Sequence, residues 1–455
     1  MSHPLPFHSL ATLFHHGRAP RHQVAFSLNE HHDWSSFTCH VHSLCEQLKQ
    51  TEASRVALCA ANSYQFAIGF FALCFSGKAI VLPGNYQPAA LDELSCEFDL
   101  LLCDEEVGSH LRQAYQLISD TLSAGKPALF PHLSLEQVVL TLFTSGSSGT
   151  PKAIRKTLKQ LDSEIAVLEQ LFGQQLQDCR IESTVSHQHI YGLLFRVLWP
   201  LCAGRAFAQT NLEYPEQLVA HASDHTALIS SPALLKRLTS EHHSSPFACV
   251  FSSGGPLSYE AAMHAQTLFS QTPWEVFGST ETGGIACRQQ HQANTPWQLF
   301  PGVDVELNQE NCLRLRSPHI DGENWYQTAD ECEMVSERQF LLKGRTDRVI
   351  KLEEKRISLV EVEKRLDHLD WINESVVIPM TESDRLTLVA AIVLTSAGTA
   401  KLNELGKGKF WLMLRGELRQ WLEPIAIPRR YRVVSEIPLN SQGKRLTNQI
   451  EQLFH

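Results

Sequence analysis

Long apolar stretches are missing from this sequence, and the longest one covers ten residues, from Phe66 to Phe75. A membrane-spanning helix needs about 20 apolar residues, so this run predicts a buried core helix and no membrane span. The N-terminal residues also lack a basic segment followed by an apolar one. We therefore expect no signal peptide.

Metal-type cysteine spacing is absent as well. None of the twelve cysteines forms a C-x-x-C pair, which argues against a zinc site or a redox dithiol. Unpatterned thiols in this number suit a reducing compartment, and we expect a cytoplasmic protein. Several of the 22 histidines are adjacent in pairs, such as His15-His16. Neighbouring histidines on one helix point to different faces, so they indicate solvated surface residues rather than a metal site.

An excess of basic charge is the third absence. The formal net charge is −10, which argues against a general nucleic-acid binder. The charge is uneven, because residues 343–455 carry a net +4 and the preceding residues carry −14. Hydrophobic residues make up 43% of the chain and charged residues 19%, as in an ordinary globular protein. An acidic partner is expected to meet the basic C-terminal segment.

Apolar periodicity predicts helices alternating with short strands through most of the chain. Residues 36–48 have a helical period, 55–60 and 79–82 read as strands, and 158–171 again predict a helix. This alternation indicates an α/β fold with mostly parallel sheets flanked by helices. Short strands separated by turns over 303–349 predict a small antiparallel β region.

The last part of the chain has the pattern of a separate α+β unit. We expect a helix at 359–366, strands at 374–378 and 386–394, and a second helix near 410–422. The prediction is thus an N-terminal domain over residues 1–345 and a small mobile C-terminal domain over 346–455.

One loop carries most of the chemical information. The apolar strand Val138–Phe143 runs into Thr144-Ser-Gly-Ser-Ser-Gly-Thr-Pro-Lys152. Hydroxyl groups, a lysine and glycines that permit a close backbone approach suit the oxygens of a phosphate. The spacing is not that of a Walker A loop. The predicted nucleotide-binding residues here are Thr144, Ser145, Gly146, Ser147, Ser148, Gly149, Thr150 and Lys152.

This loop resembles the phosphate loop of the adenylate-forming superfamily, which includes acyl- and aryl-CoA synthetases, peptide-synthetase adenylation domains and firefly luciferase. Four further segments resemble motifs of that superfamily and occur in its order. They are Phe277-Gly-Ser-Thr-Glu-Thr282, Tyr326-Gln-Thr-Ala-Asp330, the segment beginning Gly344-Arg-Thr-Asp347, and Pro438-Leu-Asn-Ser-Gln-Gly-Lys444. The resemblance spans most of the chain.

The resemblance implies a role for each matched residue of the nucleotide site. Glu281 would be the Mg²⁺ ligand, which suits a hard cation that prefers oxygen. Phe277 would lie against adenine, although a plain core position also explains it. The nucleotide-contacting residues implied in addition are Gly254, Gly255, Gly278, Thr280, Asp330 at the ribose, Arg345 and Arg356. A surface ion pair is the alternative for Arg356.

Three residues would act on the reaction itself. Lys444 would meet the negative charge that develops between the substrate carboxylate and the α-phosphate. His189 would gate the acid pocket, with a core histidine as the alternative. Asp347 occupies the position of the hinge on which the C-terminal domain rotates between half-reactions.

Two positions depart from the pattern of the superfamily. Ala329 replaces a usual glycine, a small change. Glu354 stands where CoA-using members commonly have glycine in the strand that lines the pantetheine tunnel. The second departure puts free CoA in doubt as the acceptor.

The sequence therefore predicts a ligase that uses ATP and Mg²⁺ to convert a small carboxylic acid to acyl-AMP. The acyl group would then pass to a pantetheine thiol, preferably of an acyl carrier protein, with free CoA as the alternative. An aromatic, hydroxycinnamate-like acid is favoured over a fatty acid because His189-Ile-Tyr191 resembles hydroxycinnamate-activating ligases. A non-catalytic nucleotide-binding homologue and a luciferase-like oxygenase remain as other classes.

Overall fold

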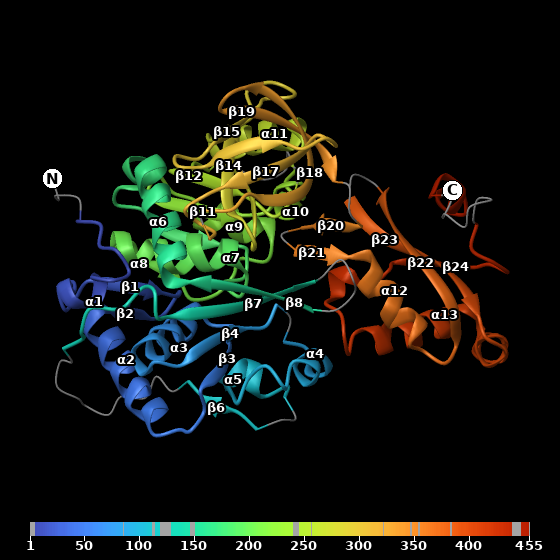
Figure 1. The fold of residues 1–455 in the computed structure, drawn as a ribbon, viewed down its shortest axis with the longest axis horizontal. Coiled ribbons are helices and arrows are strands. Elements are labelled where there is room, and N and C mark those ends of the chain that lie inside the picture. Colours follow the sequence, from blue (N-terminus) through green and yellow to red (C-terminus); the bar gives the residue numbers. More distant parts are fainter. Residues whose placement is uncertain are drawn as a thin grey trace. The chain divides into compact units, whose positions relative to one another are not determined.

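The computed structural model describes residues 5–84, 86–111, 114–118, 129–145, 151–239, 245–255, 257–321, 323–345, 348–353, 355–382, 385–438 and 447–454, without the side chains of residues 145, 345, 447 and 448. They form two compact units (Figure 1). The large unit comprises residues 1–84, 95–143 and 153–346. The small unit comprises residues 85–94, 144–152 and 347–455.

Strands from the first part of the chain form a six-stranded sheet. Its strands in spatial order are β6 (Gln116–Leu117), β5 (Leu100–Cys103), β3 (Arg55–Cys59), β4 (Ala79–Leu82), β7 (Val139–Ser145) and β8 (Pro151–Thr157). The pairs from β6 to β7 are parallel, as predicted. Helices α2 (Trp34–Lys49) and α3 (Ser63–Ser76) pack on each other beside this sheet (Figure 1). The remaining short helices of this region are α1 (Leu13–His16), α4 (Pro88–Glu93) and α5 (Glu105–Gly108).

Helix α3 shows why the apolar run folds as predicted. Asn62 caps its N-terminus by accepting bonds from the backbone N–H groups of Tyr64 and Gln65. Gly77 ends the helix in the left-handed conformation that glycine adopts without cost. Phe66 and Phe70 are fully buried, which confirms the prediction of a core helix.

A second sheet has thirteen strands among the described residues. In spatial order they are β16 (Asp304–Leu307), β17 (Cys312–Arg316), β18 (Tyr326–Ser336), β19 (Gln339–Arg345), β15 (Trp297–Leu299), β14 (Gly283–Gln289), β13 (Trp274–Ser279), β12 (Cys249–Ser252), β11 (Thr226–Ser230), β9 (Arg180–Ser183), β10 (Phe207–Ala208), β1 (Gln23–Phe26) and β2 (His31–Asp33). The strands from β13 to β1 are parallel neighbours, and the pairs from β13 to β16 are antiparallel.

The antiparallel β region predicted over 303–349 is present, but it is not a separate structure. The hairpin of β13 and β14 reverses the chain direction, and β15 then pairs with β19. These pairings make the region a continuation of the parallel sheet. A local strand pattern cannot reveal that continuity, because the linking pairs join residues about 40 positions apart, such as Trp297 and Phe340.

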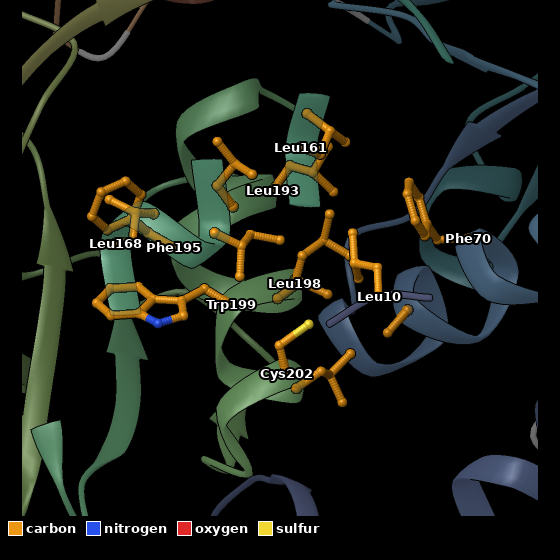
Figure 2. Close-up of a cluster of buried hydrophobic side chains, with 14 of the residues drawn as sticks. Leu10, Phe70, Leu161, Leu168, Leu193, Phe195, Leu198, Trp199 and Cys202 are labelled. Carbon is orange, nitrogen blue, oxygen red and sulfur yellow. The ribbon is translucent and has the colours of Figure 1, made fainter. Parts of the chain in front are cut away.

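The core of the large unit gathers around a helical segment after β9. Helices α7 (Ile190–Gly192) and α8 (Trp199–Ala203) enclose a π-helix at Leu193–Leu198. Figure 2 shows Leu193, Phe195 and Trp199 of this segment facing the buried residues of α6 (Leu158–Phe172). Leu10 and Phe70 lie on its other side (Figure 2). The other helices of this unit are α9 (Pro215–His221), α10 (Pro232–Leu235), α11 (Tyr259–Phe269) and a 3₁₀ turn at Gly173–Leu176.

The small unit is an α+β structure, as predicted. A three-stranded sheet has the order β22 (Ile372–Glu382), β23 (Arg385–Leu394) and β24 (Arg430–Val433). One face of this sheet packs on α12 (Leu359–Asp367) and α13 (Ser396–Leu418), and the other packs on residues of and after α14 (Thr447–Gln452). A hairpin of β20 (Val349–Leu352) and β21 (Lys355–Ser358) precedes them, and Pro424–Ala426 form a 3₁₀ turn.

Helix α13 begins fourteen residues before the predicted helix at Phe410. The part of α13 before Phe410 contains three glycines, and glycine weakens a helix, so a helix there is hard to predict from the sequence. At Gly398 a side chain would meet the carbonyl oxygen of Trp371 at 2.1 Å, so the close approach requires glycine. Gly406 has φ 75° and interrupts the helix there.

Within the described segments, no helix combines the length and the apolar character that are needed to cross a membrane.

Candidate nucleotide and acid site

Three predicted site segments lie at the carboxyl ends of strands in the parallel part of the thirteen-stranded sheet. The segment containing His189 follows β9, Gly254-Gly255 follow β12, and Gly278 to Glu281 end β13. The ends are joined directly, because Thr184 N–H donates to the Ile229 carbonyl at 2.9 Å and Ser253 Oγ donates to the Val276 carbonyl at 2.8 Å. Ligands of open α/β sheets bind at this edge. The tertiary structure therefore brings these segments together.

A tight turn holds Glu281. Thr282 Oγ1 accepts from the Ser279 N–H at 3.0 Å, and Ser279 Oγ accepts from the Thr282 N–H at 3.3 Å. Gly278 must be glycine, because a Cβ there would lie 2.3 Å from the Gly283 carbonyl oxygen. Thr280 and Glu281 are each 8% exposed. The Glu281 carboxylate is thus carried on a backbone with little freedom.

A buried lysine lies beneath this turn. Lys156 Nζ, on β8, donates to the Glu281 carbonyl at 2.8 Å and to the His319 carbonyl at 2.7 Å. Burial is the main cause that lowers the Lys156 pKa to about 8, and the charges of Glu164, Glu281 and Asp321 oppose the shift.

Two further side chains hold the strand that leaves the turn. Glu164 Oε1 accepts from the Gly284 N–H at 2.7 Å, and His319 Nδ1 donates to the Gly284 carbonyl at 3.0 Å. Both side chains are buried. Together with Lys156 they bond the backbone within the turn, at Glu281, and directly after it, at Gly284.

Phe277 is 6% exposed and packs in an aromatic cluster. Its ring centroid lies 5.4 Å from Trp297 and 5.7 Å from Phe340. These contacts are those of a core residue, the alternative that the sequence left open. Contact between Phe277 and adenine remains a prediction.

The segment around His189 is anchored by its neighbours. His187 Nε2 donates to the Ala60 carbonyl at 2.8 Å, and Ser63 Oγ bonds His187 Nδ1 at 2.9 Å. Gln188 Nε2 donates to the Leu58 carbonyl at 2.6 Å. Arg196, buried on the π-helix, donates to the Val185 carbonyl at 3.0 Å, and burial lowers its pKa to about 9. His189 itself precedes α7 and is partly exposed.

Asp330 and Arg345 are cross-strand partners in β18 and β19. Asp330 is 7% exposed, and its N–H donates to Thr328 Oγ1 at 3.1 Å. The pairing places both residues at one end of the antiparallel part of the sheet, which is a geometry consistent with their predicted position at a ribose.

In the small unit, the described ends of the phosphate loop belong to β7 and β8. Thr144 Oγ1 is buried, and within the described part of the chain it has no hydrogen-bond partner. Lys152 is exposed, and Arg356 pairs in register with Lys351 in the β20–β21 hairpin. Gly146, Ser147, Ser148, Gly149 and Thr150 lie outside the described residues, as do Asp347, Glu354 and Lys444. The side chains of Ser145 and Arg345 also lie outside them.

The donor set fits Mg²⁺ held jointly with a nucleotide. Among the described residues, no group of three or more His, Cys, Asp or Glu side chains could hold a metal ion. Mg²⁺ is usually bound by one or two carboxylates together with substrate phosphates, so a single carboxylate such as Glu281 suffices. In the small unit, the Thr144 hydroxyl has no hydrogen-bond partner among the described residues, which suits a phosphate loop.

The family model for AMP-binding enzymes matches residues 13–329. The chain belongs to the AMP-binding enzyme family. This match includes the phosphate loop and the Glu281 turn. The AMP-binding chain is an adenylate-forming ligase.

Curated relatives of this AMP-binding enzyme are ligases. The 4-coumarate–CoA ligase of Cereibacter sphaeroides is 24% identical over 306 residues, which is 67% of this chain and 69% of the relative. The D-alanine–D-alanyl carrier protein ligase of Staphylococcus aureus is 24% identical over 408 residues, which is 80% of this chain and 81% of the relative.

Solved structures support the fold. The amide bond synthetase McbA from Marinactinospora thermotolerans superposes with a TM-score of 0.83 at 16% identity, covering 98% of this chain and 99% of that one. The o-succinylbenzoate CoA synthetase MenE from Bacillus subtilis gives 0.80 at 16% identity, covering 99% of this chain and 98% of that one. The predicted α/β fold with a smaller C-terminal α+β part is therefore confirmed.

The sequence prediction missed Lys156, Glu164 and His319. One signal was present: Ile154 and Lys156 occupy the inward positions of β8, so a lysine stands where the alternation expects an apolar residue. Nothing local to the sequence marked Glu164 or His319, because their partners lie 120 and 35 residues away.

Proposed function

We propose that the enzyme activates an aromatic carboxylic acid with ATP and transfers the acyl group to the pantetheine thiol of a carrier protein. In the first step a carboxylate oxygen attacks the α-phosphorus, the bond to the β-phosphate breaks, and pyrophosphate leaves. In the second step the thiol sulfur attacks the acyl carbonyl, its proton passes to solvent, and AMP leaves. Both steps rely on positioning and on charge stabilisation.

The observation that carries the proposal is the family match together with the Glu281 turn. The match includes the phosphate loop, and the turn offers a hard oxygen ligand on a fixed backbone. Mg²⁺ bound there would neutralise charge on the phosphates. Lys444 would supply the positive charge at the attacking carboxylate, and Asp330 would accept hydrogen bonds from the ribose hydroxyls.

Two observations support an aromatic acid. The relatives include a 4-coumarate–CoA ligase. In addition, the Tyr191 and Phe195 rings lie 4.8 Å apart directly after His189, so aromatic side chains follow the proposed gating residue. An amino acid such as D-alanine is the competing substrate, because the S. aureus relative is a D-alanine ligase.

The surface of α13 supports a carrier protein as the acceptor. Phe410, Leu414 and Leu418 are buried on one face of its second half. On the opposite face, Lys409, Leu412, Gly416 and Arg419 fall within an arc of about 80° at 100° per residue. All four are exposed, and Leu412 is 68% exposed. Carrier proteins are acidic, so an apolar residue flanked by cations is a suitable docking stripe for one.

The structure narrows the basic residues that could dock a partner. Four of the eight basic side chains expected from the sequence are engaged within the small unit: Lys401 lies over the Trp371 ring, Arg415 bonds the Arg429 carbonyl, Arg430 pairs with Glu382, and Arg432 bonds the Leu453 carbonyl. The other four, Lys407, Lys409, Arg419 and Arg429, are exposed. Three of these, Lys407, Lys409 and Arg419, belong to α13 or directly follow it.

The proposed activity is tested by acid-dependent exchange of pyrophosphate into ATP. The panel comprises cinnamic and benzoic acids with and without a 4-hydroxyl group, medium-chain fatty acids and D-alanine. We expect exchange with the aromatic acids. Exchange with D-alanine or a fatty acid alone would overturn the aromatic assignment, and exchange with none would favour a non-catalytic nucleotide-binding protein.

The acceptor is tested by charge reversal at the three exposed basic residues in or directly after α13. The triple variant Lys407→Glu, Lys409→Glu, Arg419→Glu should lower kcat/KM for holo carrier protein about tenfold at low salt, because steering by charge raises association rates. Pyrophosphate exchange should not change. The matched control reverses three exposed residues of the large unit, Arg21, Lys49 and Lys159, and should transfer normally. Efficient use of free CoA with no use of the carrier protein would overturn this acceptor.

A further inference from the structure

Strand β8, which follows the phosphate loop in the sequence, contacts the backbone of Glu281, the proposed metal ligand. Strand β8 begins at Pro151, directly after the loop, and Lys156 lies five residues further along it. Its side chain crosses to the Glu281 turn, 125 residues away in the sequence, and is 3% exposed. The contact between Lys156 and the turn therefore lies within the large unit.

The contacts of Lys156 are directed at backbone rather than at a carboxylate. Its ammonium group donates to the carbonyl oxygens of Glu281 and His319. A buried ammonium group that donates hydrogen bonds to two carbonyls fixes the position of both chain segments. Both of these hydrogen bonds go to carbonyl oxygens and not to the Glu281 carboxylate.

The surroundings show that the turn is held on both sides of Glu281. Before it, the Ser279 and Thr282 bonds close the turn, and after it Glu164 and His319 bond the N–H and the carbonyl of Gly284. Lys156 is the contact at Glu281 itself. Removing the ammonium group would take a hydrogen-bond donor from the carbonyl of Glu281, the residue that carries the carboxylate, and from the carbonyl of His319.

We infer that Lys156 is a positioning residue that fixes the backbone of Glu281 and so aims its carboxylate at the Mg²⁺–nucleotide complex. The inference rests on the proposed role of Glu281 in the adenylation step. Groups that orient a metal ligand from behind typically change metal affinity 10- to 100-fold when they are removed. A residue that served stability alone would lower the folded fraction without changing the Mg²⁺ requirement.

The test replaces Lys156 by methionine, which keeps the length of the chain but donates no hydrogen bond. Pyrophosphate exchange is measured as a function of Mg²⁺ concentration at saturating ATP and acid. We expect the half-saturating Mg²⁺ concentration of Lys156→Met to rise about tenfold, with a smaller loss of rate at saturating Mg²⁺. Lys159→Met, three residues away and exposed, is the matched control and should behave as the native enzyme.

A second readout needs no turnover. We expect ATP to stabilise the native enzyme against heat, and the additional stabilisation when Mg²⁺ accompanies ATP should be reduced in Lys156→Met but not in Lys159→Met. Lys156→Gln, which retains a shorter amide donor, should show a rise of about threefold in the Mg²⁺ requirement. It serves as the test variant if the methionine protein does not fold.

The outcomes separate this inference from the proposed function. If Glu281→Ala raises the Mg²⁺ requirement while folded Lys156→Met or Lys156→Gln matches the native protein in both readouts, the positioning role is wrong and the proposed function stands. If the native enzyme shows no acid-dependent exchange and no effect of Mg²⁺ on ATP binding, the proposed function fails and takes this inference with it.

Discussion

Lys156 in the large unit and Lys409 in the small unit are the same residue type in opposite surroundings. Lys156 is 3% exposed and donates to two carbonyls, and burial lowers its pKa to about 8. Lys409 is exposed on α13 beside an exposed leucine. A desolvated charge holds backbone in place, whereas a solvated charge acts over a distance that salt can screen. The comparison teaches that a buried lysine acts through fixed hydrogen bonds, whereas an exposed lysine keeps its charge available to a partner, as proposed for Lys409.

The largest effect is expected from a third lysine, which the sequence assigns to catalysis. Lys444→Ala should lower pyrophosphate exchange by about 10³-fold, because a lost preorganised charge costs two to three orders of magnitude. Thioester formation from supplied acyl-AMP should survive. Unchanged exchange would contradict the role of Lys444, and equal loss of both half-reactions would indicate a folding defect.

The second prediction concerns the hinge between the predicted domains. Asp347→Pro fixes φ near −65° and should lock one conformer. If the adenylation conformer is trapped, exchange persists while thioester formation falls by about 10²-fold. Rapid-quench measurement of each half-reaction checks this, and an equal decrease in both would remove Asp347 from the hinge.

The third prediction uses glycines to sharpen the contrast between a crowded and an open region. Gly283 has φ +67°, and a Cβ there would lie 2.6 Å from Glu164 Oε2 and 2.8 Å from His319 Cβ. Gly283→Ala should therefore destabilise the large unit by about 2 kcal/mol. Gly416→Ala, where a Cβ meets no atom within 4 Å, should stabilise α13 by up to about 1 kcal/mol. Denaturant unfolding measures the change in the free energy of unfolding for both variants. Changes of the same sign would contradict the contrast between a crowded and an open region.

The smallest effect concerns pH and the anchored segment before His189. Burial lowers the pKa of His187 well below its usual value of 6.5. Below pH 6.5 the unfolded chain binds a proton that the folded His187 does not, so the free energy of unfolding falls as pH decreases, by at most about 1.4 kcal/mol per pH unit. In His187→Gln this contribution is absent.

The stability difference between native protein and His187→Gln should therefore shrink between pH 7.5 and pH 5.5. Unfolding midpoints at the two pH values measure it, with the exposed His225→Gln as the control. A difference that does not change with pH would mean that folding does not shift the pKa of His187.

The sequence alone determined the helices and strands whose signals are local. The apolar run at 66–75 lies within α3, and the strand predicted at 79–82 has those bounds in the structure. Periodicity and caps are properties of neighbouring residues, so they can be read without the fold. The order of the motifs likewise identified the family, which the match over residues 13–329 confirms.

Only the tertiary structure decided which distant residues meet. Sheet pairing made β16–β19 a continuation of the parallel sheet. In the first part of α13, Gly398 lacks a side chain and so lets the helix approach the backbone of Trp371 closely. The contact of Lys156 with Glu281 joins residues 125 positions apart. Such contacts depend on burial and on hydrogen bonds between segments, and no local pattern encodes them, because the partner of a buried donor is chosen by the packing of the whole unit.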